Sequence, residues 1–178
     1  MAQNLRLVGS KTLTSADSDV SSNWTLPAAS TSGFSSNTAA NVGPVNSSYG
    51  NGAYYTWCAA TAGSCSSATS SGAEVSASIC PKGWRLPPNS GNKSYYNLIT
   101  TAYGYSNGGQ LTAQPLQFAY GGYYSNSSFS NGGSRGNYWS STAYSSADAY
   151  YLRFYSSYAD PQNGSGRYGG YSVRCVAR

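Results

Sequence analysis

The chain has 178 residues, a length at which we expect one domain with its own hydrophobic core. Only 8% of its residues are charged, whereas 15% are aromatic, and this aromatic content argues against a disordered chain. The net charge of +5 comes from scattered basic residues rather than from a basic run, which argues against a nucleic-acid partner. No apolar segment is long enough to span a bilayer, so we expect no direct membrane insertion.

The composition also suggests a kind of surface. The chain contains 18 tyrosines beside many serines, glycines and asparagines. In binding loops, tyrosine supplies rigid contact area and the small polar residues adapt around it. A tyrosine-rich β domain that uses the ring only for strand propensity and packing is the alternative.

In chain order, residues 1–50 are polar with scattered apolar positions, and we expect an N-terminal arm or short strands that pack on a body formed by residues 51–178. The aromatic run AYYTWC at 53–58 favours a strand. The small polar residues at 61–78 predict a loop, with one helical turn near Glu74 to Ser78. Three prolines forbid a regular helix within ICPKGWRLPP at 79–88.

Residues 94–103 are the best helix candidate, because Tyr95, Leu98, Ile99 and Ala102 fall on one helical face. Ser94 suits the N-cap and Gly104 the stop. The stretch 104–137 is rich in glycine, tyrosine, serine and asparagine, and is too long for a plain connection. Strands are predicted further on, at 138–142, 149–155 and 171–177. The expected core is Trp57, Trp84, Leu86, Leu98, Trp139, Leu152, Phe154 and Val173.

Four cysteines suggest disulfides and an oxidising compartment. Of the three possible pairings we favour Cys58 with Cys65 and Cys80 with Cys175, because a bridge that closes a long loop removes the most chain entropy. A zinc site is a poor alternative, because the sequence has no C-x-x-C spacing and no histidine.

Side chains alternate between the two faces of a strand, so 149–155 should present two different sets. One set is apolar and suits a core: Tyr150, Leu152 and Phe154. The other suits a partly exposed surface: Tyr151, Arg153 and Tyr155. Tyrosine and arginine are enriched at binding hot spots, so we expect a binding face beside a loop at 156–170. A solvated face with ordinary cross-strand tyrosine pairs is the alternative.

Three motifs occur together: ICPKGWRLPP, YWSSTA followed by AYYLRF, and GYSVRCV near the end. Over residues 53–178 this combination resembles bacterial paralogous domains whose hallmark is a C-P-x-G-W-R-L-P segment and a terminal S-V-R-C-V strand. The resemblance implies an α+β domain of C-type lectin-like fold, of the formylglycine-generating-enzyme type. Such a domain has antiparallel strands, one or two helices and long loops.

A closer resemblance is to the variable proteins of diversity-generating retroelements, in which adenines of a template are rewritten into a variable region, here about 138–175. The template carries asparagine codons at the varied sites. The resemblance implies fixed residues at Tyr150, Leu152, Phe154, Pro161, Gln162, Arg167 and SVRCV. It implies varied positions at residues reachable from asparagine codons: Tyr144, Ser145, Ala147, Asp148, Tyr151, Arg153, Tyr155, Tyr158, Asp160, Asn163, Gly164, Ser165, Gly166, Tyr168 and Gly169.

The resemblance implies a non-catalytic, receptor- or adhesin-like protein of prokaryotic or viral source, outside the cell or on a cell or virion surface. Its ligand would be a protein or glycan on another cell or virus. The expected ligand-binding residues are Tyr144, Ser145, Ala147, Asp148, Tyr151, Arg153, Tyr155, Tyr158, Asp160, Asn163, Ser165 and Tyr168. An undiversified adhesion or carbohydrate-binding domain of the same fold is the alternative.

Catalysis is not expected. The chain lacks histidine for general base work, its five acidic residues are spread thinly, and its cysteines are better explained as two bridges. We expect no cofactor and no metal site, because only Asp148 and Asp160 offer carboxylates near the YWSST strand, and calcium prefers several.

Overall fold

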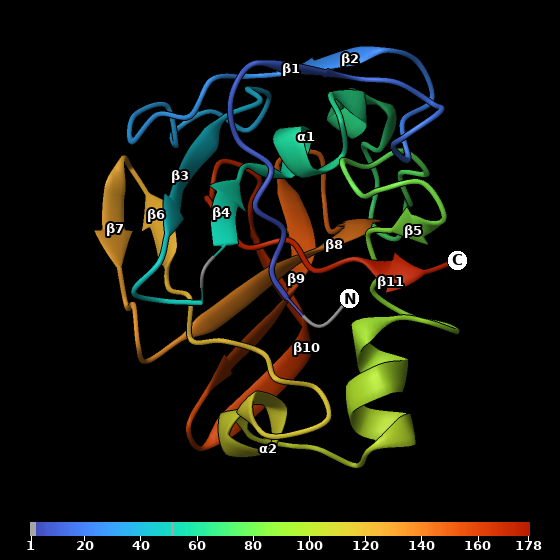
Figure 1. The fold of residues 1–178 in the computed structure, drawn as a ribbon. Helices are drawn as coiled ribbons and strands as arrows, with labels where there is room; N and C mark the ends of the chain where they lie inside the picture. The colour runs from blue at the N-terminus through green and yellow to red at the C-terminus, as the bar shows by residue number, and fades with distance from the viewer. Residues whose placement is uncertain (1–2, 51) are drawn as a thin grey trace.

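The computed structural model describes residues 3–50 and 52–178, and its largest sheet has three antiparallel strands. These are β8 (Gly136–Ala143), β9 (Asp148–Tyr155) and β10 (Tyr158–Gly166), in the order β10-β9-β8 (Figure 1). The remaining ladders have two strands each: β1 (Lys11–Leu13) with β2 (Trp24–Leu26), β3 (Val42–Asn46) with β4 (Gly52–Tyr55), β5 (Trp84–Arg85) with β11 (Val176–Ala177), and β6 (Tyr123–Ser125) with β7 (Ser128–Ser130).

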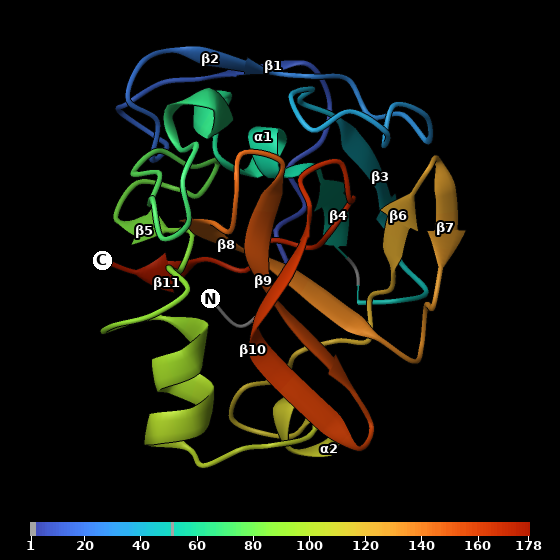
Figure 2. The same cartoon turned by 180° about the vertical axis from the view of Figure 1, so that it is seen from behind.

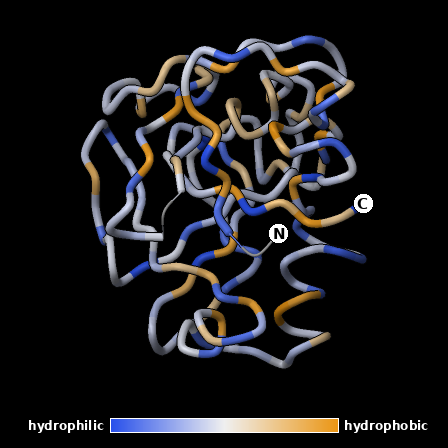
Figure 3. Tube along the Cα trace, viewed as in Figure 1, coloured by the Kyte–Doolittle hydropathy of each residue, from blue (hydrophilic) through white to orange (hydrophobic). Residues whose placement is uncertain are grey.

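The helices are short. They are α1 (Trp57–Ala60), the 3-10 helix η1 (Ser64–Ser67), the π-helix η2 (Asn97–Ala102) and α2 (Gly108–Thr112). Antiparallel ladders with a few short helices and long turns confirm the α+β class. Figure 3 shows hydrophobic and hydrophilic residues alternating in short stretches along the trace, and within the described residues no helix has both the length and the apolar character needed to cross a bilayer.

The three-stranded sheet lies between two hydrophobic cores. The larger core, on the side of α1, takes Trp139, Ala149 and Tyr151 from the sheet. The smaller core, on the side of η2 and α2, takes Tyr138, Leu152 and Phe154. Strand β8 contributes to both and is buried along its whole length, which explains its apolar and small residues. The sheet therefore has little exposed surface except on β9 and β10.

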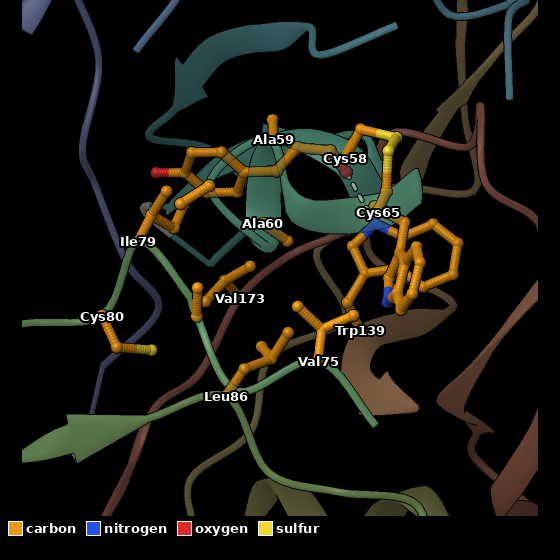
Figure 4. Close-up of a cluster of buried hydrophobic side chains, with 14 of the residues drawn as sticks. Cys58, Ala59, Ala60, Cys65, Val75, Ile79, Cys80, Leu86, Trp139 and Val173 are labelled. Atoms are coloured by element: carbon orange, nitrogen blue, oxygen red, sulfur yellow. Dashed lines mark hydrogen bonds between the residues drawn. A yellow bond between two sulfur atoms is a disulfide. The ribbon is translucent and has the colours of Figure 1, made fainter. Parts of the chain in front are cut away.

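The larger core gathers around α1 (Figure 4). In the close-up, the Cys58–Cys65 disulfide lies at one side of this helix, and Val173 and Trp139 lie below it. The indole N–H of Trp139 donates to the Tyr55 carbonyl at 2.7 Å, so this buried polar group is satisfied. The second disulfide joins Cys80 to Cys175, which is the pairing that loop entropy favours.

Residues before 51 share this core. Leu13, Val20, Leu26 and Val42 are buried in the same cluster as Trp57. The backbone of Leu5 accepts a hydrogen bond from Ala53 and donates one to Val173. Residue 51, where the predicted body begins, lies outside the described residues. The N-terminal segment thus packs against both ends of the rest of the chain.

Several predicted elements differ from the observed ones. The run AYYTWC is a strand only to Tyr55, and α1 begins at Trp57. No helical turn forms at Glu74, which instead makes a bridge to Thr142. The terminal segment makes isolated bridges at Tyr171 and Ser172 and forms a strand only at β11. The predicted loop at 156–170 is mostly strand β10.

The predicted helix at 94–103 exists but is wound differently. The Ser94 hydroxyl accepts from the Asn97 N–H at 2.9 Å, as expected of an N-cap, and Gly104 follows the helix with φ 65°. The helix between them is a π-helix, so its faces do not follow the 3.6-residue period. Ile99 is therefore buried as predicted, whereas Ala102 is exposed.

Candidate functional site

Strand β9 buries a different face at each of its ends. Near the β8–β9 hairpin, Ala149 and Tyr151 point into the larger core. Toward the β9–β10 hairpin, Leu152 and Phe154 point into the smaller core on the opposite face. The prediction that Tyr151 is a surface residue is therefore wrong, since its side chain is only 5% exposed. Tyr150, predicted to be core, is half-buried.

The side chains of β9 do alternate between the two faces of the sheet, as predicted. Tyr151 is buried because other residues pack over its part of the face. Trp139 packs edge-on to Tyr151 at 6.0 Å between ring centroids, and Tyr171 lies 4.8 Å from the same ring. No such cover reaches Arg153 and Tyr155, which lie on the same face but are half-buried. The exposed part of this face thus begins beyond Tyr151. The two hairpins lie at opposite ends of the sheet (Figure 2).

Strand β10 extends this exposed face. Its register pairs Tyr158 with Tyr155 and Asp160 with Arg153, and residues directly opposite each other in an antiparallel pair share a face. The register then shifts by one residue, so that Asn163 lies opposite Tyr151. The shift is a β-bulge at 161–162, and it keeps Asn163 and Ser165 on the same face as Asp160. Proline is tolerated at such a bulge in an edge strand.

We call the resulting surface the Arg–Tyr face. It consists of Arg135, Arg153, Tyr155, Tyr158, Asp160 and Asn163. The rings of Tyr155 and Tyr158 stack at 5.3 Å between centroids. The guanidinium of Arg153 lies 5.7 Å from the Tyr158 ring centroid, and that of Arg135 lies 5.9 Å from the Tyr155 ring centroid. These are cation–π distances, so the rings hold both arginines along the face.

A hydrogen-bonded carboxylate organises the edge-strand side of the Arg–Tyr face. Asp160 accepts hydrogen bonds from the Tyr158 hydroxyl at 3.2 Å, the Asn163 amide at 2.8 Å and the backbone N–H of Gln162 at 2.9 Å. Both carboxylate oxygens are thereby used within β10. The Asp160 side chain shapes this side of the face and is engaged by its own strand.

Tyrosines form the floor next to this face. Tyr171 stacks on Trp139 at 4.3 Å and shares a 2.8 Å hydrogen bond with Ser165. Burial raises the pKa of the Tyr151 hydroxyl, and the nearby guanidinium groups of Arg153 and Arg135 act in the opposite direction.

A second exposed surface occupies the opposite side of the sheet. We call it the tyrosine patch: Tyr144, Tyr150 and Tyr168, with Gly164 and Gly166 beneath. Tyr144 packs edge-on to Tyr150 at 5.0 Å and is 48% exposed. A Cβ added at Gly164 would lie 2.9 Å from the Tyr144 ring. The two glycines thus let the tyrosine rings lie close to the backbone of β10.

The β8–β9 hairpin is held by its own polar groups. The Ser145 hydroxyl donates to the Asp148 carboxylate at 2.8 Å and accepts from the backbone N–H groups of Ala147 and Asp148 at 3.1 and 2.9 Å. This pattern is a serine-capped turn. Ser145, Ala147 and Asp148, predicted as ligand-binding residues, therefore lie in a turn whose polar side chains are already bonded to one another.

Arg167 anchors this hairpin from inside. Its side chain is 3% exposed and donates to the carbonyls of Cys65 at 2.9 Å and Ser145 at 2.6 Å, and also to that of Ala68. Its guanidinium lies 4.3 Å from the Trp57 ring centroid. Burial lowers the pKa of this guanidinium. Arg167 is thus part of the scaffold that positions the hairpin.

The predicted site residues therefore divide into four sets. Arg153, Tyr155, Tyr158, Asp160 and Asn163 come together on the Arg–Tyr face. Tyr144 and Tyr168 belong to the tyrosine patch, and Ser145, Ala147 and Asp148 to the hairpin turn. Tyr151 and Ser165 belong to the floor. Arg135 was not predicted, because only the pairing of Gly136 with Phe154 brings position 135 next to Tyr155.

Within the described residues, no three Asp, Glu, Cys or His side chains gather closely enough to hold a metal ion, and all four cysteines are bridged. A mainly apolar hollow of about 420 Å³ lies near β11 and η2, between Trp84, Leu98 and Leu116. None of its lining residues belongs to the Arg–Tyr face or to the tyrosine patch.

Comparison of the chain with models of known protein families, with characterised proteins and with solved structures finds no match.

Proposed function

We propose that the chain is a non-catalytic ligand-binding protein of C-type lectin-like fold whose C-terminal surface is diversified by a retroelement. One observation supports this most. Residues interpreted as varied line the exposed surfaces of β9 and β10, whereas residues interpreted as fixed are buried or shape the backbone. Leu152, Phe154 and Arg167 are at most 3% exposed, and Pro161 with Gln162 forms the bulge that sets the register of β10.

Three positions depart from this division. Tyr151 and Gly169 are interpreted as varied but are buried, and Tyr150 is interpreted as fixed but is half-buried. Tyr150 and Tyr151 lie in the middle of β9, where the exposed side of the strand changes from one face of the sheet to the other. Tyr151 adjoins the Arg–Tyr face, so a change of its size would alter the floor of that face rather than its contact surface.

The chemistry of the Arg–Tyr face suits recognition. Tyrosine and arginine carry much of the binding free energy at protein interfaces, and both occur here on neighbouring strands rather than on a mobile loop. A site on paired strands is already ordered before it binds, which reduces the entropy lost on association. The two bridged cysteine pairs and the lack of histidine favour binding over catalysis. The ligand belongs to another cell or virus, and the chain acts outside the cell or at a surface.

Sequencing natural copies of the gene and its neighbourhood tests diversification. We expect a near-identical repeat beside a reverse-transcriptase gene, with differences confined to template adenines. Among sibling proteins the changes should fall at codons such as those of Tyr155, Tyr158 and Asp160, and should spare those of Leu152 and Arg167. Changes spread evenly over residues 1–178 would contradict diversification and would favour an ordinary adhesion domain.

A further inference from the structure

The Arg–Tyr face carries two positive charges that no carboxylate of the described residues neutralises through an ion pair. The ion pairs of the described residues join Arg85 to Glu74 and Arg178 to Asp19, and neither pair includes a residue of this face. Arg153 lies directly opposite Asp160 in the β9–β10 register, but that carboxylate accepts hydrogen bonds from its own strand instead. Arg135 and Arg153 therefore give the face a net positive charge.

Two donors near the base of this face also lack an acceptor in the described part of the chain. They are the Nε of Arg153 and the side-chain nitrogen of Asn137, which pairs with Arg153 in the β8–β9 register. Asn137 is 2% exposed. Buried donors are normally paired, and an unpaired one costs free energy. Both atoms are covered by the protein, so they lie beneath the face and are not themselves contact points for a bound group.

The aromatic residues define what else the partner presents. Tyr155 and Tyr158 stack beside Arg153, and the Arg135 guanidinium lies 5.8 Å from the Tyr123 ring centroid. Three well-formed hollows of the described surface include no residue of this face. Side chains on paired strands form a broad surface, which suits a protein interface better than a small-molecule pocket.

The polar groups that commonly bind sugar hydroxyls are already engaged here. The Asp160 carboxylate and the Asn163 amide bond to each other at 2.8 Å. What the face offers to a partner is cationic and aromatic. This balance favours a protein partner with carboxylates next to apolar side chains over a neutral glycan.

Resting on the proposed function, we propose that the Arg–Tyr face binds an acidic segment of a partner protein. One carboxylate of that segment lies between the guanidinium groups of Arg135 and Arg153, and a neighbouring apolar side chain packs on Tyr155 and Tyr158. The net charge of +5 on the whole chain adds long-range attraction to such a segment.

The test pans a random dodecapeptide phage library against the full chain and against three variants. One variant is Arg135→Ala with Arg153→Ala, the second is Tyr155→Ala with Tyr158→Ala, and the third is a control. The control, Arg6→Ala with Lys11→Ala, removes the same amount of charge from exposed positions outside the face. Folding of each variant is checked by thermal denaturation, and enriched peptides are synthesised for affinity measurement at 50 and 500 mM NaCl.

We expect the peptides enriched on the wild type to carry an excess of aspartate and glutamate beside aromatic or aliphatic residues. The arginine variant should bind them at least about tenfold more weakly, the control should bind them unchanged, and high salt should weaken the wild type. Enriched peptides that need the two tyrosines but have no acidic bias, or that tolerate loss of both arginines, would overturn the proposal of an acidic partner. They would leave the proposed ligand-binding function standing. Binding of heparin through this face without peptide enrichment would overturn a protein partner. If no enrichment depends on the arginines or the tyrosines, the proposed function itself fails.

Discussion

Tyrosines on the neighbouring strands β9 and β10 have different structural roles, because their surroundings differ. Tyr151 lies between Trp139 and Tyr171 and is 5% exposed. Tyr158, whose ring stacks on Tyr155, is 38% exposed. The first ring fills space in the larger core, whereas the second covers the surface of an edge strand. That both residues are tyrosines therefore does not determine their roles. The burial of each ring determines whether it belongs to the core or to the surface.

Tyr151→Ala should reduce the free energy of unfolding by about 3 kcal/mol, because it removes a packed aromatic side chain and leaves a cavity. Tyr158→Ala is the matched control and should change it by no more than about 0.5 kcal/mol, as expected of a surface substitution. Urea denaturation of the two variants and the wild type measures both values. Equal effects would mean that Tyr151 is not part of the core.

Strand β10 shows where sequence patterns stop being informative. Its residues YADPQNGSG have low strand propensity, and they predict a loop. Backbone pairing with β9 overrides that preference, and the bulge at 161–162 changes which residues share a face. The strands β8 and β9 and the disulfide pairing could be predicted, because apolar alternation and loop entropy act locally or pairwise. The cover over Tyr151 and the position of Arg135 depend on tertiary packing, which the pattern of one strand does not contain.

The β8–β9 hairpin should depend on Arg167 for its position. Arg167→Ala leaves the carbonyls of Cys65, Ala68 and Ser145 without their donor, and hydrogen bonds to a charged group contribute about 1.5–3 kcal/mol each. We expect a loss of at least about 3 kcal/mol in unfolding free energy. Arg167→Lys should recover little, because an ammonium cannot reproduce the planar fork of donors. Full recovery by lysine would mean that charge alone holds the hairpin.

At the scale of the molecule, the two disulfides close loops of very different length. Cys80 and Cys175 are 95 residues apart in sequence, and Cys58 and Cys65 are 7 apart. The long loop should give the larger chain-entropy effect, about 4–5 kcal/mol against about 2 kcal/mol for the short one. Denaturation of Cys80→Ser/Cys175→Ser and of Cys58→Ser/Cys65→Ser compares them. The opposite order would mean that packing around α1, rather than loop entropy, controls their contributions.

The buried tyrosines make a further prediction about alkaline stability. Burial raises the pKa of Tyr55, Tyr95, Tyr138 and Tyr171 above the ordinary value of 10.0. The folded state therefore holds these protons more tightly than the unfolded state does. Their contribution to stability is complete below pH 10 and decreases above it, by about 1.4 kcal/mol per pH unit for each tyrosine that stays protonated. Urea denaturation between pH 8 and 11.5 should show this decline, and stability that is constant to pH 11.5 would contradict it.

The most direct test of the central claim, that the Arg–Tyr face binds ligand on an independent scaffold, is one paired measurement on Arg153→Ala/Tyr155→Ala/Tyr158→Ala. The affinity for a peptide selected on the wild type and the melting temperature are measured on the same sample. We expect the affinity to fall by about 100-fold, as for truncated hot spots, while the melting temperature changes by less than about 4 °C. Unchanged affinity, or loss of the folded state together with binding, would contradict the claim.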